Sequence, residues 1–438
     1  MSPTPPVAVR RLDRLVLGRV RAARNDHLVR NSLFIMLSAG ATAALGFVFW
    51  ILVARTYSPS EVGESTTLLS ATLLISYLSL LGFNNTFPRF LARSNRPNEE
   101  INTVLSVVGG SAIVISVAYV AAIPLISPRL DFVTHSPAYA VAFVALTAAN
   151  ALNLITDSVF IAYRSSHYNL LVDGVVQSST KLALPLLFVS LGAFGIYLAS
   201  GLAATVAVLL SVYLMIKRFS FRPKPMISPH VLRELGGYSV GNYAANLFNL
   251  VPAFVLPILV LDLQGSAAAG FFYVAFQLAN LLNMITYAIM ENLLTEGGHG
   301  ETPIGVLARR SARLQALLII PTAAVVCLLG PYLLELFGAS YRTHATALLI
   351  SLVASVPAIA FSSWALTLLK VGGHLRGLIG SNAICALVVC GMAAAFVGHG
   401  LVWVGVALIV GNVITGAIAC VILVRTWKTT AWPMNAHE

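Results

Sequence analysis

Two stretches of this chain place polar and aromatic side chains at helical spacing inside apolar sequence. Their residue types suit the binding of a polar substrate, because amides and hydroxyls can both donate and accept hydrogen bonds. Steps of three and four residues put each set on one face of a helix. The Tyr273 row consists of Tyr273, Gln277, Asn280, Met284, Tyr287 and Glu291, and the Asn242 row consists of Asn242, Asn246 and Asn249.

Both rows lie in segments that are otherwise apolar enough to cross a membrane, 237–261 and 266–290. An amide in hydrocarbon costs free energy unless it is paired, so each row must face protein or a water-filled cavity. We predict that the two rows face each other across a central cavity that accepts the substrate. The alternative is that each row makes hydrogen bonds between packed helices and binds nothing.

Three ionisable side chains form a further group in the first half of the chain. Asp157 lies in the apolar segment 139–163, and Asp173 and Lys181 lie at 171–191. Lys181 is the only Lys or Arg well inside an apolar segment, so it needs a partner or water. Asp157 is about one helical turn nearer the intervening loop than Lys181, a drop that a lysine side chain can cover. A structural ion pair and a role in transport or ion coupling are both open for this group.

The composition places the chain among integral membrane proteins. Its 438 residues are 58% hydrophobic and 10% charged, with a mean hydropathy of +0.85, unlike soluble domains. Crossing about 30 Å of hydrocarbon takes roughly 20 apolar residues. We therefore expect an all-α integral membrane protein with about twelve transmembrane helices, at 32–54, 66–86, 103–126, 139–163, 171–191, 193–216, 237–261, 266–290, 311–337, 346–369, 376–397 and 400–424.

Basic residues are distributed unevenly over the connections between these segments. The formal net charge is +11, and 23 of the 27 Lys and Arg residues fall at the two ends of the chain or in every second connection. The alternate connections hold only Arg55, Arg129 and Arg342. This positive-inside pattern predicts cytoplasmic termini in a multi-pass protein of the plasma (inner) membrane. The charge thus indicates topology and contact with anionic lipid, and we expect no nucleic-acid partner.

The expected organisation is two lobes of six helices each. We predict a basic cytoplasmic segment over 1–30, an N-terminal lobe over 31–217, a cytoplasmic linker over 218–236, a C-terminal lobe over 237–427 and a cytoplasmic tail over 428–438. A basic run with two prolines marks the linker.

The two lobes align with each other as a repeat. Gly63 aligns with Gly270 at an offset of 207 residues (270 − 63). Halves with the same helix order suggest a duplicated six-helix unit with a pseudo-two-fold axis along the membrane normal. The alignment extends the predicted cavity to polar positions of the first lobe, pairing Thr42 with Asn249, Ser70 with Gln277 and Asn84 with Glu291.

Two arginines near predicted helix ends are further candidates for binding an anion. Arg55 flanks an outer turn, and Arg89 lies at a cytoplasmic helix end. A surface ion pair with Glu64 would also explain Arg55, and an anchor that sets topology would also explain Arg89. The four cysteines all lie in predicted spans and have no zinc or disulfide spacing. We therefore expect no metal site and no cofactor, with H⁺ or Na⁺ as the candidate coupling ion.

Four stretches carry a resemblance to a known family. They are ARTYSPSEVG at 54–63, LLGFNNTFPRF at 80–90, FFYVAFQLAN at 271–280 and LFGASY at 336–341. In these stretches, and loosely over nearly the whole chain, the sequence resembles the polysaccharide-biosynthesis flippases of the multidrug/oligosaccharidyl-lipid/polysaccharide exporter superfamily. The resemblance implies two six-helix lobes that form a V, with the first two helices of each lobe facing the cleft.

The resemblance also implies a function. Members of this group are flippases, not enzymes, and move a polyprenyl-pyrophosphate-linked oligosaccharide between the leaflets for the synthesis of cell-surface polysaccharide. Such a substrate needs cations for its pyrophosphate and amides, hydroxyls and aromatic faces for its sugars. Lys181, Arg55 and Arg89 are the candidate cations. The lipid-linked sugar and membrane lipids are then the expected partners, with a polysaccharide polymerase and glycosyltransferases as further candidates.

Two other functions remain open. One is an ion-coupled drug or cation antiporter of the same fold, which we would expect to carry a carboxylate in its first or seventh helix. Neither the segment 32–54 nor the segment 237–261 contains an acidic residue. The first acidic residue after the second of these segments is Asp262. The other is a membrane scaffold that recruits glycosyltransferases without transporting anything. The chain has no Walker motif, so transport would draw on an ion gradient, the membrane potential or downstream use of the sugar.

Overall fold

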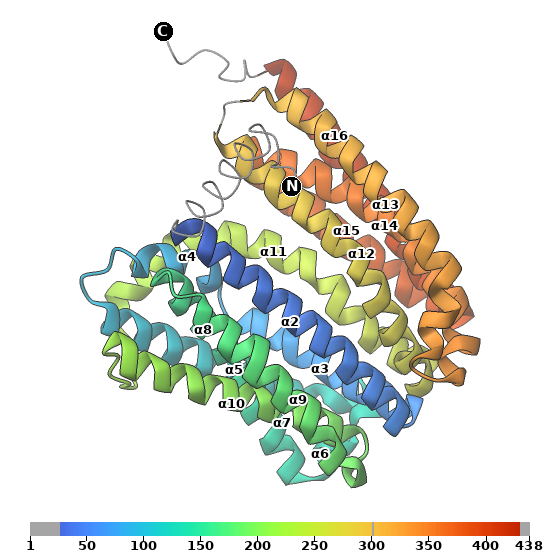
Figure 1. The fold of residues 1–438 in the computed structure, drawn as a ribbon, viewed down its shortest axis with the longest axis horizontal. Coiled ribbons are helices and arrows are strands. Elements are labelled where there is room, and N and C mark those ends of the chain that lie inside the picture. The colour runs from blue at the N-terminus through green and yellow to red at the C-terminus, as the bar shows by residue number, and fades with distance from the viewer. Residues whose placement is uncertain (1–26, 300–301, 430–438) are drawn as a thin grey trace, which may run out of the picture.

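The computed structural model describes residues 27–299 and 302–429, and all the regular structure in these residues is helical (Figure 1). The expected all-α class is therefore confirmed. Most of the predicted N-terminal basic segment and of the C-terminal tail, 1–26 and 430–438, lies outside the described residues.

The helices of the first half are α2 (His27–Thr56), α3 (Pro59–Ser79), α4 (Phe83–Leu91), α5 (Pro97–Ile126), α6 (Phe132–His135), α7 (Pro137–Ala162), α8 (His167–Asn169), the π-helix η2 (Leu170–Gln177), α9 (Ser178–Ala183) and α10 (Ala193–Phe219). Those of the second half are α11 (Pro229–Gln264), α12 (Ser266–His299), α13 (Ile304–Glu335), α14 (Ala339–Val371), α15 (Leu375–Phe396) and α16 (Val402–Thr429). Short 3₁₀ turns lie at Pro128–Leu130, Leu184–Leu187, Val189–Leu191 and Val397–His399.

Ten helical segments among the described residues are long and apolar enough to cross a membrane. They correspond to the predicted spans from 103–126 onward. The first predicted span falls in α2, whose apolar described part, Gly40–Thr56, is shorter. The second falls in α3 and α4, which are rich in Ser, Thr and Asn and therefore less apolar.

The second predicted span, 66–86, is not one continuous helix. Helix α3 begins earlier, at Pro59, because Ser58 and Glu61 form a capping box in which each side chain binds the backbone N–H of the other residue. The helix then ends at Ser79, and Leu81 and Gly82 have φ angles of 49° and 81°. Left-handed residues stop an α-helix, so the chain turns and starts again as α4.

The helices pack in two groups that follow the order of the chain (Figure 1). In the first half α7 packs against α3, α5 and α10, and in the second half α14 packs against α12, α13 and α16. The two groups meet where α3 packs against both α11 and α12. Large hydrophobic side chains such as Leu125, Leu209 and Leu317 remain exposed on the outside, which suits a surface that is solvated by lipid.

The segment between α10 and α11, which connects the two groups, is extended and lies against α5. Asn102 accepts a hydrogen bond from the backbone N–H of Lys224 and donates one to the carbonyl of Arg222. Asn98 accepts from the N–H of Arg222. Helix α11 begins at Pro229, earlier than the predicted span at 237. The connection is thus attached to the first half by its own backbone hydrogen bonds.

The two aligned glycines of the repeat meet at the crossing of α3 and α12. A Cβ atom on Gly63 would overlap the carbonyl oxygen of Ser266 and lie 2.7 Å from the backbone nitrogen of Gly270. A Cβ atom on Gly270 would overlap the carbonyl oxygen of Pro59 and lie 3.3 Å from the nitrogen of Gly63. Equivalent positions of two repeats touch only next to the axis that relates them, so this crossing is where the expected repeat would have its two-fold axis.

Further contacts join the two halves around this crossing. Arg55 Nε donates a hydrogen bond of 2.7 Å to the carbonyl oxygen of Leu336, and Ser127 Oγ donates one of 2.8 Å to Asp262 Oδ1. All four residues lie at the helix ends that the charge pattern assigns to the outer side. The halves are therefore closed against each other at that end.

Candidate functional site

Lys181 lies in α9, directly after the π-helix Leu170–Gln177, and points at two aromatic rings of α2. Its Nζ is 4.5 Å from the centre of the Phe49 ring and 5.6 Å from that of Trp50. The negative face of an aromatic ring attracts an ammonium group. The lysine is thus stabilised by ring faces in a place where an isolated charge would be costly.

The Tyr273 row begins next to the same rings. Trp50 and Tyr273 have their ring centres 4.6 Å apart, and Gln277 Nε2 donates a hydrogen bond of 3.2 Å to the Tyr273 hydroxyl. We call Lys181, Phe49, Trp50, Tyr273 and Gln277 the Trp50 cluster. It joins a cation, three aromatic rings and an amide across the two halves of the molecule.

Sequence reasoning missed Phe49 and Trp50. They are 1% and 5% exposed and lie in an apolar run with no polar neighbour to mark a face. The signal available was the tryptophan itself, since Trp in membrane proteins usually lies at an interface with polar groups.

The Tyr273 row becomes more exposed along α12. Asn280 is half-buried and accepts a hydrogen bond of 3.1 Å from Asn283 Nδ2. Met284 and Tyr287 are 47% and 55% exposed, and Glu291 is exposed. The row therefore runs from the Trp50 cluster to an open face of α12.

The Asn242 row lies elsewhere. A small cavity of about 200 Å³ is lined by side chains of α11, α3 and α4, and Tyr243 donates a hydrogen bond of 2.8 Å to the carbonyl oxygen of Leu78 at its edge. The cavity contains Asn246, Asn249, Asn84 and Tyr77 together with Tyr243, Leu247 and Leu250. The side chain of Asn242 lies outside the described residues.

The predicted positions are thus brought together in two places and not in one cavity. Asn84 lines the same cavity as Asn246 and Asn249. Glu291, with which the repeat alignment pairs Asn84, does not line this cavity. Ser70 is buried and donates to the carbonyl oxygen of Thr66 in its own helix. Thr42 is exposed on α2.

The two carboxyl groups of the first half contact each other. Asp157 and Asp173 are within hydrogen-bonding reach, and Asn153 Nδ2 donates to Asp173 Oδ1 at 3.0 Å and to Gln177 at 3.5 Å. Asp157 Oδ1 is buried and has no hydrogen-bond partner among the described residues. Lys181 faces the rings instead, so an Asp157–Lys181 ion pair is not present.

The helix that carries these residues is not a regular α-helix, because residues 170–177 form a π-helix with i→i+5 hydrogen bonds and α9 follows it. Asp173 and Gln177 still share a face, since Asn153 Nδ2 contacts both. Lys181, in α9, contacts the rings of α2 and not Asp157.

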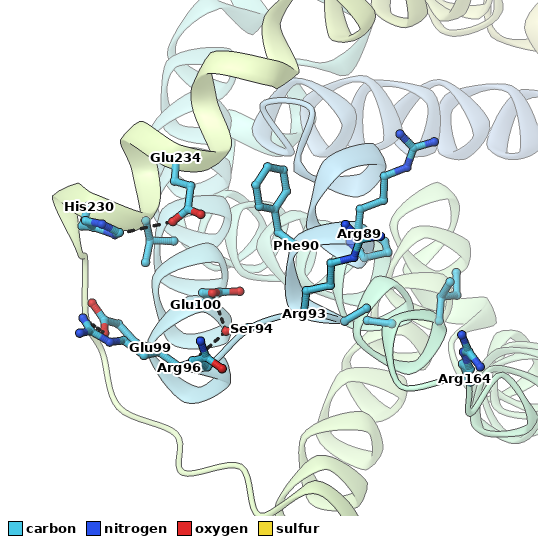
Figure 2. A pocket seen from close by; sticks show the side chains of 16 residues that line it. Arg89, Phe90, Arg93, Ser94, Arg96, Glu99, Glu100, Arg164, His230 and Glu234 are labelled. Carbon is cyan, nitrogen blue, oxygen red and sulfur yellow. Dashed lines mark hydrogen bonds and ion pairs between the residues drawn. The ribbon is translucent and has the colours of Figure 1, made fainter.

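A larger cavity, of about 1040 Å³, lies at the opposite end from the Gly63–Gly270 crossing and contains Arg89. Figure 2 shows its acidic side chains on one side, with Arg96 paired to Glu99 at 3.7 Å and His230 to Glu234 at 3.7 Å. Three other arginines lie away from these pairs (Figure 2). They are Arg89, Arg93 and Arg164.

The three guanidinium groups make no hydrogen bond or ion pair within the described ranges. Two of them, Arg89 and Arg93, are one turn apart near the end of α4, and Arg164 lies in the turn after α7. Their charges are therefore available to an anion such as a phosphate.

Comparisons with known proteins agree on the family and the fold. A family model described as "Polysaccharide biosynthesis protein" matches residues 28–293. A comparison with curated protein sequences finds no match.

Among solved structures, the chain is similar to a multidrug resistance MATE family transporter of the MOP superfamily in an inward-facing conformation. The TM-score is 0.70 at 16% identity, over 89% of this chain and 96% of that chain. An outward-facing conformation of such a transporter gives a TM-score of 0.61 at 16% identity, over 94% and 99% of the two chains. A MOP superfamily transporter from Pyrococcus furiosus gives 0.62 at 15% identity, with the same coverage. The chain has the fold of these transporters.

Proposed function

This chain belongs to the polysaccharide biosynthesis protein family, and from that premise we propose that it is an alternating-access flippase. Its substrate is a polyprenyl-pyrophosphate-linked oligosaccharide, moved across the plasma membrane for the synthesis of cell-surface polysaccharide. The observation that supports this most is the Trp50 cluster, because it unites groups suited to a charged, sugar-bearing substrate across the two halves.

The chemistry of the cluster matches the two parts of such a substrate. Lys181 supplies the cation that a pyrophosphate requires. Trp50 and Tyr273 supply ring faces on which sugars pack, and Gln277 supplies an amide for hydroxyl groups. When the halves separate, Trp50 parts from Tyr273, and the groups that were bound to each other become free for the substrate.

The substrate approaches from the side of Arg89, Arg93 and Arg164, which the positive-inside pattern assigns to the cytoplasm together with both termini. These arginines attract the pyrophosphate at the membrane surface, and the polyprenyl tail stays in the bilayer. The exposed face of α12 around Tyr287 then leads the sugars toward the Trp50 cluster. The contact between Gly63 and Gly270 closes the outer end in this state.

Protons are our proposed source of energy. Asp157 and Asp173 are the proposed site of proton uptake, because two carboxyl groups in contact cannot both be ionised at low cost. Their position in the first half, near Lys181 in sequence, allows proton uptake to alter the packing of the π-helix against α2, which carries Trp50. The polymerase and glycosyltransferases that use the same lipid-linked sugar are the proposed partners.

An antiporter of drugs or organic cations is the second candidate, and the similarity to MATE family transporters favours it. Lys181 argues against it, because an ammonium group at the centre of the site repels a cationic substrate.

The test is transport by the reconstituted protein. Proteoliposomes carrying a fluorescent lipid-linked oligosaccharide are treated with an impermeant glycosidase, which reports the fraction of sugar on the outer leaflet. We expect Lys181→Met and Trp50→Leu each to lower the rate about tenfold, since each removes a contact of roughly 1–2 kcal/mol. Trp403→Leu is the matched control, because Trp403 stacks on Phe396, away from the cluster.

Two results would overturn the proposal. One is that wild-type protein exports small organic cations and does not move the lipid-linked sugar. The other is that folded Lys181→Met and Trp50→Leu proteins, checked by size-exclusion chromatography, transport as fast as Trp403→Leu.

A further inference from the structure

A second cavity suited to a ligand lies in the other half of the molecule, between α13 and α14, which pack side by side (Figure 1). Its volume is about 250 Å³, and Ile319, Ile320, Pro357 and Phe361 form most of its apolar wall. Ile320 and Phe361 are 61% and 38% exposed, so the groove opens to the outside of the helix bundle. In a membrane this opening faces lipid.

One polar side chain in this groove lacks a partner. Gln315 is 5% exposed and lines the groove. Its Nε2 is buried and has no hydrogen-bond partner in the part of the chain that the structure describes. A buried amide donor without an acceptor is costly, so an occupant that brings an acceptor to Gln315 would be stabilised.

Two arginines continue the groove toward the Arg89 end of the molecule. Arg309 and Arg313 are four residues apart in α13. Ala316 lies seven residues after Arg309, and Ile320 lies seven residues after Arg313, on the same face of the helix. Both arginines are exposed, and neither side chain has a hydrogen bond or ion pair within 27–299 and 302–429. Arg310 is equally exposed, but it lies about 100° around the helix from Arg309 and about 60° from Arg313, on the side of α13 that points away from the groove.

A tryptophan indicates how deep in the membrane the arginine end of the groove lies. Trp364 lines the groove and donates a hydrogen bond of 3.0 Å from Nε1 to the carbonyl oxygen of Ala308. Tryptophan is enriched where the hydrocarbon meets the headgroups. The two arginines therefore lie at headgroup level, and the apolar part of the groove lies at the level of the acyl chains.

We propose that this groove binds one anionic phospholipid of the adjacent leaflet, of the phosphatidylglycerol class. Arg309 and Arg313 bind the phosphate, Gln315 donates to an ester carbonyl, and an acyl chain lies along Ile320 and Phe361. Gln315 is two residues beyond Arg313, a rise of about 3 Å with a turn of about 200° around the axis of α13, so Gln315 meets the lipid from the α14 side of the groove and the arginines meet it from the open side. Polyprenyl phosphates contain no ester, so Gln315 favours a phospholipid over the lipid of the transported substrate.

The first test measures bound lipid by native mass spectrometry of the delipidated full chain, titrated with phosphatidylglycerol or with phosphatidylcholine of the same acyl chains. We expect tighter binding of phosphatidylglycerol to the wild type. Arg309→Gln and Arg313→Gln should each weaken it about fivefold, while Arg310→Gln should leave it unchanged. Equal binding of both lipids, or an equal loss in Arg310→Gln, would overturn the proposal.

The second test concerns the acceptor of Gln315. The wild type should bind ester-linked phosphatidylglycerol more tightly than its diether analogue, and Gln315→Leu should remove this difference. An unchanged preference in Gln315→Leu would refute the assigned contact. Displacement of phosphatidylglycerol by undecaprenyl phosphate at equal concentration would also refute the proposal, since the groove would then belong to the substrate. These results do not depend on the transport assay.

Discussion

Three charged side chains of the first half, Asp157, Asp173 and Lys181, illustrate how partners are chosen inside an apolar bundle. The lysine contacts ring faces, and the two acids contact each other. Pairing each acid with the lysine would have neutralised more charge, but the side chains point in different directions. Residue types alone thus identified these three side chains as a group, whereas the packing of the helices decided which of them contact each other.

The carboxyl pair leads to a prediction about coupling. A gradient of one pH unit supplies about 1.4 kcal/mol per proton, so wild-type transport in proteoliposomes should change rate when the gradient is imposed or reversed. Asp173→Asn removes one member of the pair and should make the rate insensitive to the gradient. Transport is measured at several internal and external pH values.

The control for this measurement is Asp131→Asn. Asp131 lies in the turn before α6, 3.2 Å from His135, far from the pair in sequence. This variant should keep the wild-type response. If Asp173→Asn responds to the gradient as strongly as Asp131→Asn, the carboxyl pair is not the coupling site.

At the level of helices, the crossing of α3 and α12 depends on the absence of two side chains. Backbone atoms of each helix occupy the space where the Cβ of the other's glycine would lie. Small residues permit such close approach of transmembrane helices. The crossing therefore stabilises the state in which the outer end is closed, and opening of that end must separate these two glycines.

We predict that Gly63→Ala and Gly270→Ala both shift the protein away from this closed state. The reporter is Thr67→Cys in a background without the four native cysteines, because Thr67 is buried in α3. An impermeant thiol reagent added outside should label it several-fold faster in either alanine variant, since an added methyl group forces the helices apart.

Gly110→Ala is the control, because a Cβ atom there would meet nothing within 4 Å. It should leave the labelling rate of Thr67→Cys unchanged. Equal rates in Gly63→Ala, Gly270→Ala and Gly110→Ala would mean that the crossing does not hold the outer end closed.

For the whole molecule, alternating access requires the two halves to separate at the outer end, where Arg55 contacts Leu336 and Ser127 contacts Asp262. At the same end α3 crosses α12 in close contact and also packs against α11. Separation therefore breaks the α3–α12 crossing together with these two contacts, and leaves the packing within each group of helices intact.

We predict that a cross-link between the halves stops transport. Ser127→Cys with Asp262→Cys should form a disulfide on oxidation, because the two side chains are in contact, with Oγ and Oδ1 2.8 Å apart. Oxidation should lower the rate of lipid-linked sugar transport at least tenfold, and reduction should restore it. The cross-linked fraction is read from a mobility shift after a single protease cut between the two sites.

The single variants Ser127→Cys and Asp262→Cys, oxidised in the same way, are the matched controls. Neither can join the two halves, so oxidation should not change their transport. Undiminished transport by the fully cross-linked Ser127/Asp262 pair would contradict a mechanism in which the halves separate at the outer end.

Sequence by itself determined the membrane class, the helical segments and the family, because apolar length and helical periodicity are local properties. The alignment of Gly63 with Gly270 also came from the sequence, and the structure brings these two residues into contact. Which helices a polar row faces was decided only by the tertiary structure, since that depends on packing between residues far apart in the chain. Lys181 contacts the rings of Phe49 and Trp50, and the Asn242 row packs against α3 and α4, so the residues of the one predicted cavity lie in two separate groups.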